Sequence, residues 1–564
     1  MNITSILIAL LVALHISMAE ASKGQTRNMI QKEKEKVKKP KKPKKCKIAE
    51  MYISDGSRLG NIIASLIEEQ DFASYCNEVD FNAATEWFLN ADNHTPDLLT
   101  DDDEYMKERL ILALTYSANC KDGCTLPTDE DNWMSATNHC NWAGVICNDL
   151  NKVSKLDMSR SGLTGDYTMF GMQSLEVLDL TSNDLSSTFT VAGESANANR
   201  LTLDHNNLSS FFGGEMLPSL KFLYLTFNDF TGDFIITSKD FPTSIQYLNL
   251  GSNMISGFFG GDILTSLKSL GLSSNDFVGD FAITSKDFPT SLQFLHLHGN
   301  KLTGFRDGVM LTNLQSLYLS NNDFVGDFVI TPKDFPTSLE KLYLHENMLT
   351  GFIDGSILEN LDTLALYDNA FVDDFVIDPK DFPTSIQYLY LGRNVLTGFV
   401  GGEILTKLEY LSLSSNNFVG DFSITSKDFP AFIRSLALDN NMLTGFVDSG
   451  KILTNLEYLE LTSNKFTGEL HLEADDYPSS LTTLILNKNS GLTKIDAEEN
   501  AVPFLSSLQL HDIEGIKVGY ELCYRSGYGS LEIFPSLCNW LRLIIASFLK
   551  EQDFQKYGPL ASLT

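Results

Sequence analysis

The feature that most constrains this chain is a short motif that recurs at fixed spacing. The motif reads L-x-x-L-x-L-x-x-N-x-[LF] and can be placed sixteen times. Its starts are residues 153, 175, 198, 220, 245, 267, 292, 314, 339, 361, 386, 408, 433, 456, 481 and 505. Between 220 and 433 the spacing alternates strictly between 25 and 22 residues, so the larger unit is a 47-residue pair. Such a period predicts a solenoid, because one coil buries its apolar face only against its neighbours.

The spacing within the motif predicts the local structure. L-x-L is extended chain whose leucines point inward and whose middle residue points outward, so stacked coils form a curved parallel sheet. Asn occupies the ninth position in fourteen units, the exceptions being Ser161 and Ile513 in the terminal ones. Its amide both donates and accepts, so we expect it to satisfy backbone groups where the chain leaves the strand. The aromatic residues of the recurring Asp-Phe-Pro are predicted to form an internal spine; they are Phe241, Phe288, Phe335, Phe382 and Phe429.

The residues before the repeats predict export. Residues 1–21 hold an apolar run followed by Ala19-Glu20-Ala21, a pattern typical of a signal peptide. Residues 22–47 hold twelve Lys or Arg against two Glu and predict a basic tether without a core. Residues 48–119 have a helical apolar pattern. No later stretch reaches eighteen apolar residues, so we predict a secreted or cell-surface protein without a transmembrane span after signal removal.

The eight cysteines lie outside the repeats, six before them and two after. In an exported protein an even number allows complete pairing. Candidate pairs are Cys120 with Cys124 and Cys46 with Cys76, and their connectivity is open. Cys523 and Cys538 predict a disulfide-closed C-terminal cap over residues 514–564. Residues 120–152 are predicted to be a cysteine-rich N-terminal cap, and residues 153–513 the repeats.

Charge and motifs exclude several function classes. The net charge is −31, and the chain after the basic tether carries about −40, which disfavours nucleic acid or an anionic membrane as the main partner. Catalytic and phosphate-binding motifs are absent from the sequence, so we predict no enzyme and no cofactor. His296 and His298 project from one predicted strand, and His345 repeats His298 one 47-residue period later. The two strands are about 10 Å apart, too far for shared tetrahedral metal ligation without help from a carboxylate. The recurring acidic residues Asp280, Asp327, Asp374 and Asp421 are interpreted as a solvated edge, with calcium as the alternative.

Outward positions on the predicted strands are the third, fifth, seventh and eighth of each unit, and many are aromatic. The candidate ligand-binding residues are Phe222, Tyr224, Tyr247, Phe294, His296, Tyr318, Tyr343, Tyr388, Tyr390, Tyr410 and Tyr458. Exposed Tyr combines wide apolar area with a hydroxyl, as in protein-recognition hot spots and sugar-stacking platforms. The alternative is cross-strand aromatic pairing that only strengthens the sheet.

One segment carries a family resemblance. Trp133, Cys140-Asn141-Trp142-Ala143-Gly144-Val145-Ile146-Cys147 and the following Val153–Met158 and Leu163-Thr164-Gly165 resemble the N-terminal cap and first repeat of plant-type leucine-rich-repeat proteins. That family includes receptor-kinase ectodomains and polygalacturonase inhibitors. The resemblance runs to about Ile513 and implies an α/β leucine-rich-repeat horseshoe with a parallel concave β-sheet. It also implies a Cys140–Cys147 disulfide.

The sequence departs from that family after the Leu-x-Gly element. Gly279-Asp280-Phe281 stands where Gly-x-Ile-Pro is usual. A second strand on the convex side therefore does not follow from the resemblance, and neither does a particular ligand. No kinase glycine loop or catalytic Asp pattern follows the repeats in the sequence.

These observations predict a recognition module that binds a protein or polysaccharide through its concave face. Inhibitor and receptor-like roles are both open, as is a co-receptor. Asn93 and Asn207 begin glycosylation motifs, in line with export. The alternative is a structural or surface-adsorbing extracellular protein that binds matrix, ice or mineral, because Thr237, Thr284, Thr331 and Thr425 recur in one phase.

Overall fold

The computed structural model describes residues 61–62, 84, 87, 103–119, 133–135, 137–447, 449–473 and 476–497, with strand segments 507–509, 517–518, 524–527 and 530–533. The predicted signal peptide and basic tether lie outside the described residues. So do Asn93, Cys46, Cys76, Cys120, Cys124, Cys523 and Cys538. The proposed pairings of these cysteines and the domain boundaries therefore stay predictions.

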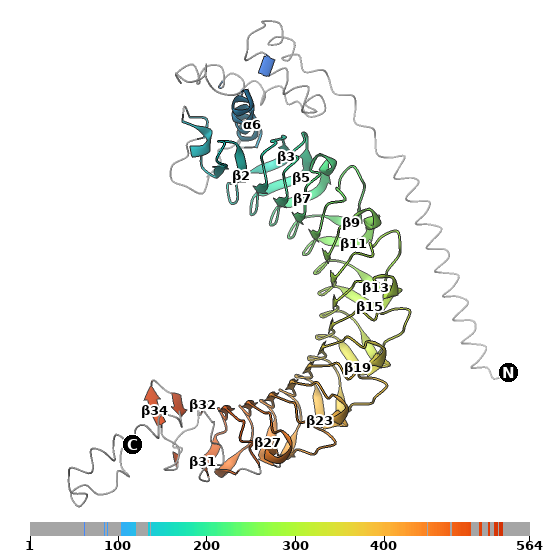
Figure 1. The fold of residues 1–564 in the computed structure, drawn as a ribbon, viewed down its shortest axis with the longest axis vertical. Coiled ribbons are helices and arrows are strands. Elements are labelled where there is room, and N and C mark those ends of the chain that lie inside the picture. The colour runs from blue at the N-terminus through green and yellow to red at the C-terminus, as the bar shows by residue number, and fades with distance from the viewer. Residues whose placement is uncertain are drawn as a thin grey trace, which may run out of the picture.

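The described chain is a solenoid bent into an arc, and its main 19-stranded sheet lines the inner side (Figure 1). One strand of this sheet stands at every predicted repeat start. These strands are β2 (Val153–Asp157), β4 (Val177–Asp179), β6 (Arg200–Thr202), β8 (Phe222–Tyr224), β10 (Tyr247–Asn249), β12 (Ser269–Gly271), β14 (Phe294–His296), β16 (Ser316–Tyr318), β18 (Lys341–Tyr343), β20 (Thr363–Ala365), β22 (Tyr388–Tyr390), β24 (Tyr410–Ser412), β26 (Ser435–Ala437), β28 (Tyr458–Glu460), β30 (Thr483–Ile485) and β32 (Ser507–Gln509). Neighbours pair in parallel with leucine opposite leucine, as at Leu317 and Leu342. The predicted concave sheet is confirmed.

Antiparallel strands close both ends of the inner sheet. At the N-terminal end β1 (Val145–Cys147) pairs with β2. At the other end β35 (Ser530–Ile533) pairs with β32 and with β34 (Tyr524–Gly527). An uncovered strand edge offers unpaired N–H and C=O groups to other chains, so these strands limit lateral association of the sheet.

A second set of strands lies on the outer side of the arc (Figure 1). Their bounds are β3 (Thr164–Met169), β5 (Asp184–Val191), β7 (Asn207–Phe212), β9 (Thr231–Ile235), β11 (Met254–Phe259), β13 (Val278–Ala282), β15 (Lys301–Arg306), β17 (Val325–Val329), β19 (Met348–Ile353), β21 (Val372–Val376), β23 (Val395–Val400), β25 (Val419–Ser423), β27 (Met442–Val447), β29 (Thr467–Leu472), β31 (Gly491–Ala497) and β33 (Lys517–Val518). They form short parallel sheets of two or three strands. The departure from Gly-x-Ile-Pro therefore does not abolish an outer strand. In Val278-Gly279-Asp280-Phe281 the phenylalanine is buried while valine and aspartate are exposed, which is the alternation of a half-buried strand.

Short helical turns connect the outer strands to the next coil. They are the 3₁₀ turns η3 (Gly214–Met216), η4 (Gly261–Ile263), η5 (Gly308–Met310), η6 (Gly355–Ile357) and η7 (Gly402–Ile404), and the α-helical turn α7 (Ser449–Ile452). Most follow a residue in the left-handed region, such as Gly260 at φ 74°. In that region glycine carries no steric cost.

The core between the two sets of strands is made of leucine and phenylalanine. The five spine residues predicted from the sequence are buried, with Phe335 2% exposed. The Phe335 ring lies 5.4 Å from that of Phe305 and 5.5 Å from that of Phe328, measured between ring centroids. The predicted packing role of these phenylalanines is confirmed.

The repeated asparagines form a buried ladder along the edge of the inner sheet. The Asn322 Nδ2 group donates to the carbonyls of Leu297 and Leu319, each at 3.1 Å. Its Oδ1 accepts the N–H of Leu302 at 3.0 Å. Each amide therefore satisfies backbone groups of adjacent coils, as the motif predicts.

The N-terminal end of the core is covered by α6 (Asp103–Asn119), which begins at the acidic residues expected at a helix start. Glu108 of this helix accepts the N–H of Val153 at 3.0 Å, which ties it to the first repeat. The Arg109 guanidinium lies 4.8 Å from the Trp142 ring centroid and donates to the carbonyls of Ser135 and Thr137. No helix among the described residues is long and apolar enough to cross a membrane.

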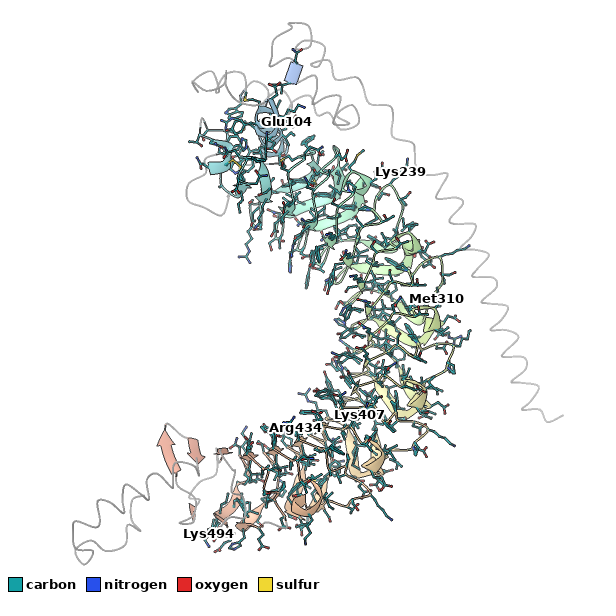
Figure 2. All side chains as sticks on the ribbon, viewed as in Figure 1. Glu104, Lys239, Met310, Lys407, Arg434 and Lys494 are labelled. Atoms are coloured by element: carbon teal, nitrogen blue, oxygen red, sulfur yellow. A yellow bond between two sulfur atoms is a disulfide. The ribbon has the colours of Figure 1, made fainter. Side chains whose placement is uncertain are left out.

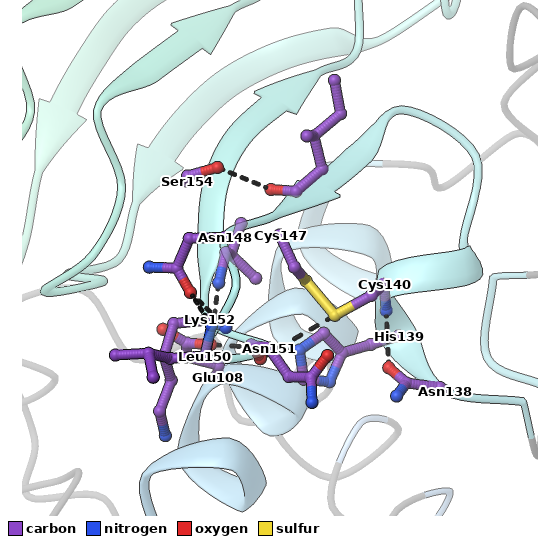
Figure 3. The surroundings of a disulfide bond; sticks show 12 residues. Glu108, Asn138, His139, Cys140, Cys147, Asn148, Leu150, Asn151, Lys152 and Ser154 are labelled. Atoms are coloured by element: carbon purple, nitrogen blue, oxygen red, sulfur yellow. Dashed lines mark hydrogen bonds and ion pairs between the residues drawn. A yellow bond between two sulfur atoms is a disulfide. The ribbon is translucent and has the colours of Figure 1, made fainter.

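The Cys140–Cys147 disulfide implied by the family resemblance is present (Figure 3). It joins η2 (His139–Asn141) to β1, the strand that closes the inner sheet. The Asn138 side chain caps η2 by accepting the N–H of Cys140. The disulfide therefore fixes the cap against the first coil.

Candidate functional site

The inner face of the arc holds all eleven aromatic residues predicted from the sequence. Each stands on a strand of the main sheet and none is buried. Tyr247 and Tyr388 are the most exposed of them, at 39% and 38%. The aromatic set is therefore accessible on the inner face, and its binding role stays a prediction.

Five of the inner rings in the middle of the arc stack on their neighbours. His296 and Tyr318 are 4.3 Å apart between centroids and nearly parallel, and Tyr318 and Tyr343 are 4.6 Å apart at 5°. A second stack of His345 on Tyr367, at 4.2 Å, meets the first edge-on. We call these rings, with His298, the central cluster. Since stacked rings cover one another's faces, the cluster presents ring edges, hydroxyls and imidazole nitrogens.

Five further aromatic residues lie on the inner face and were not among the eleven candidates. His298, His345 and Tyr367 belong to the central cluster, and His205 stacks on Phe227 at 4.3 Å nearer the N-terminus. All five occupy the seventh or eighth position of a unit. These positions point outward by the same template as the third and fifth, so the sequence held the signal.

The histidines of the central cluster are neutral at physiological pH. Burial, followed by the neighbouring His298, lowers the pKa of His296 to about 4. Burial likewise lowers the pKa of His345 to about 4. The pKa of His298 is also lowered by burial. The cluster is therefore polar at its edges without being charged.

The charge of the inner face differs from that of the whole chain. Its outward positions carry a near-balanced set of cations and anions: Lys155, Arg160, Arg200, Lys341, Arg393 and Lys488 against Asp157, Asp179, Asp204, Glu346, Asp368, Asp439 and Glu460. From unit 220 through unit 314, no outward position carries Asp, Glu, Lys or Arg. In a molecule of net charge −31, the inner face is thus the side with little net charge.

The inner rings towards the C-terminus lie among acidic groups. Tyr390 and Tyr410 are 5.0 Å apart between centroids. The Tyr458 hydroxyl donates to Glu460 at 2.8 Å, and burial together with this carboxylate raises the pKa of Tyr458. Towards the N-terminus the Arg200 guanidinium lies 4.8 Å from the Tyr224 ring centroid. The inner face therefore has a neutral middle flanked by charged ends.

The recurring acidic residues lie on outer strands and are exposed. Asp280 forms an ion pair with Arg306. Asp327 accepts the hydroxyl of Thr350, and Asp421 that of Thr444. Their partners are thus side chains of the next coil, and the interpretation as a solvated edge agrees with this placement.

The recurring threonines have structural partners in the outer loops. The Thr284 hydroxyl donates to Asp287 at 2.5 Å, and Thr331 donates to Asp334 at 2.6 Å. The other carboxylate oxygen of Asp334 accepts the N–H of Asp307 in the preceding coil. These hydroxyls therefore stabilise the loops, and adsorption by the threonine array stays a prediction without further support.

A predicted glycosylation site and a group of potential metal ligands can also be located. Asn207 is exposed at the start of β7, where a glycan would be accessible, and its modification stays a prediction. Among the described residues, one group of His and Cys side chains has ligand atoms close together, namely His139, Cys140 and Cys147. Its two sulfurs form the disulfide, so they are not free to bind a metal as thiolates.

Parts of the repeat region match a known family, and a short segment of the chain matches a known protein. The family described as Leucine Rich repeat matches residues 171–188. A protein named Receptor-like protein 35, from Arabidopsis thaliana, is 42% identical over 64 residues, which cover 10% of this chain and 7% of that protein.

Solved structures give matches at low similarity over longer stretches. An internalin from Listeria monocytogenes is 26% identical, with 48% of this chain and 76% of that chain covered and a TM-score of 0.40. The ectodomain of the receptor kinase GASSHO1/SCHENGEN3 from Arabidopsis thaliana, in complex with CASPARIAN STRIP INTEGRITY FACTOR 2, is 19% identical. There 70% of this chain and 63% of that chain are covered, with a TM-score of 0.31. With its repeated motif, parallel inner sheet and asparagine ladder, the chain has the fold of a leucine-rich-repeat horseshoe.

Proposed function

We propose that this chain is a secreted or cell-surface recognition protein that binds a protein partner on its inner face. The observation that carries the proposal is an accessible aromatic surface with little net charge on an otherwise strongly acidic molecule. Apolar and aromatic area releases water on contact, whereas the acidic outer side repels other acidic proteins. The proposal assigns the chain no chemistry of its own.

The ring geometry favours a protein over a polysaccharide. A sugar stacks on the open face of an aromatic ring, and in the central cluster each stacked ring has at least one face covered by a neighbour, Tyr318 both. Ring edges with hydroxyl and imidazole groups suit hydrogen bonds and side-chain packing instead, as in protein hot spots. Cross-strand pairing, the alternative for these aromatics, contributes to the sheet at the same time.

The signal-peptide pattern and the cap disulfide support an extracellular site of action. The name of the Arabidopsis relative is in line with this site over the short segment matched. A receptor-like role, an inhibitor role and a co-receptor are finer forms of the same proposal.

Affinity capture with the mature chain from a surface extract of its own cells tests the proposal. One bait is unaltered, one carries Tyr343→Ala, Tyr388→Ala and Tyr390→Ala, and a matched control carries Val278→Ala, Val325→Ala and Val372→Ala on outer strands. We expect the tyrosine variant to capture at least one protein about tenfold less, because truncating hot-spot rings costs about 1–2 kcal/mol or more.

The control bait should capture that protein like the unaltered chain. Circular dichroism confirms that all baits are folded. Equal capture by all three baits would contradict the proposed face.

A further inference from the structure

The 47-residue repeat provides internal copies against which each position can be compared. In four successive copies the residue two places after the loop proline is serine, whose hydroxyl donates to a leucine carbonyl of the preceding coil at 2.7–2.8 Å. These serines are Ser244, Ser291, Ser338 and Ser385. The fifth copy has Phe432 there, and its side chain is 57% exposed. A structural hydrogen bond is thus replaced by an aromatic ring in water.

Two neighbouring positions depart from the repeat at the same place. Arg434 stands where the other copies have Gln246, Gln293, Glu340 and Gln387. Lys407 stands where the corresponding copies have Ser266, Asn313 and Asn360. The three departures come from adjacent coils and line one pocket of about 540 Å³, which we call the Phe432 pocket. Figure 2 shows Lys407 and Arg434 on the same stretch of the arc.

The substitutions that depart from the repeat, rather than the presence of a pocket, distinguish the Phe432 pocket. A pocket of about 510 Å³ lies at a corresponding edge nearer the N-terminus, lined by Lys221, Glu176, uncharged polar residues and Pro218. It includes Ser244, a member of the regular serine series, and has no aromatic side chain. The hollow therefore recurs with the solenoid, and a cation lines both pockets. What belongs to the Phe432 pocket is the aromatic ring together with two cations that depart from the repeat, in a lining that also holds Glu409 and Glu457.

The Phe432 pocket has the composition of a contact site. The Arg434 guanidinium donates to Glu457 at 2.7 and 3.2 Å, which fixes it in the lining that it shares with Phe432. Lys407 is exposed and forms no ion pair with any described residue. Exposed Phe costs free energy in water, and an Arg beside an aromatic ring is typical of an interface anchor. A free ammonium beside an apolar ring complements a carboxylate next to an apolar side chain.

We propose that the Phe432 pocket is a second binding site, separate from the inner aromatic face. Its occupant is a segment of another protein that places an apolar side chain on Phe432 and an Asp or Glu beside it on Lys407. The inference does not depend on the proposed function of the inner face, because its residues precede the inner strands and belong to none of them.

A variant that restores the repeat tests this inference without endangering the fold. It carries Lys407→Asn, Phe432→Ser and Arg434→Gln, residues that other copies already hold at these positions. Serine at 432 is expected to restore the bond to the Leu408 carbonyl, so the variant should melt at the same temperature or higher. The matched control carries Asn313→Ala, Ser338→Ala and Glu340→Ala at corresponding positions of earlier copies.

The probe is a phage-displayed random dodecapeptide library, depleted on the restored variant and then selected on the unaltered chain. We expect peptides in which an Asp or Glu adjoins an aromatic or aliphatic residue. As synthetic peptides they should bind the restored variant at least tenfold more weakly by fluorescence anisotropy. They should bind the control and the Tyr343, Tyr388, Tyr390 variant as they bind the unaltered chain.

Three outcomes would overturn the inference. The depleted library could yield no binder, the peptides could lack the carboxylate–apolar pairing, or their binding could fall with the inner-face tyrosines instead. A single substitution separates the two halves of the proposed contact. Lys407→Asn alone should weaken binding and reduce its salt dependence, whereas Phe432→Ser should weaken it at every salt concentration.

Discussion

The inner and outer sides of the arc are built from the same repeat, but only one of them varies from coil to coil. On the outer side Asp-Phe-Pro-Thr-Ser recurs unchanged in four successive copies. On the inner side the fifth position runs through His296, Tyr318, Tyr343, Ala365 and Tyr390. Outer-loop residues are fixed because they fill the core and join coils, whereas inner outward residues contact only their neighbours on the sheet.

This difference indicates which positions of a solenoid can determine binding specificity. Residues that every coil needs must repeat, since each coil packs on a copy of itself. A position that can vary without loss of packing is available for binding. The Phe432 pocket is the converse case. There a loop position that is serine in four copies has changed, so packing does not require serine in this coil.

The largest expected effect is a loss of stability when the phenylalanine spine is truncated. Phe335→Ala is expected to destabilise the protein by about 3–5 kcal/mol, because it opens a cavity between coils. Phe294→Ala, at a half-buried inner position, should cost well under half as much. Urea unfolding followed by circular dichroism measures both. Equal losses would show that the inner rings are also part of the core.

The asparagine ladder is the next test. Asn322→Ala removes a buried amide and leaves three carbonyls and one N–H without this partner, with an expected loss on the order of 3 kcal/mol. The adjacent Asn321 is exposed with φ 51°, so Asn321→Gly should change stability little. The same unfolding measurement compares them. A small loss for Asn322→Ala would mean that water replaces the amide.

A further test concerns the central cluster and pH. Since the folded-state pKa values of His296 and His345 are lowered to about 4 from 6.5, the unfolded chain binds more protons between these values. This contribution to stability is complete above pH 6.5 and is lost as pH falls towards 4. A His296→Gln, His345→Gln variant should lose less melting temperature between pH 7 and pH 4 than the unaltered chain. Identical pH profiles would show that the two imidazoles titrate freely.

Much of the fold could be predicted from the sequence because the repeat leaves few alternatives. The leucine spacing predicts the sixteen parallel inner strands, and the ninth-position asparagine predicts the ladder that joins coils. The outer strands at Val278–Ala282 and its copies did not follow from the family resemblance, since the expected Gly-x-Ile-Pro is missing. The outer strand forms there without that motif, because Phe281 is buried while its neighbours are exposed.

The candidate site was predicted less completely. Outward position identifies the eleven aromatics, but it does not say which rings stack, because ring contact depends on side-chain rotamers and on the spacing between coils. Tyr367 and His345 complete the central cluster only through such contacts. The lowered pKa of His345 likewise follows from burial by neighbouring coils.

The repeat, the inner sheet and the phenylalanine spine could be predicted from the sequence because each follows from local spacing, and the cap disulfide was implied by the family resemblance. Only the tertiary structure decided which faces of the inner rings remain open. It also brought Lys407, Phe432 and Arg434 into one pocket. The reason is physical: coil stacking makes neighbours of residues about 25 positions apart, and their side chains define a surface that no single coil contains.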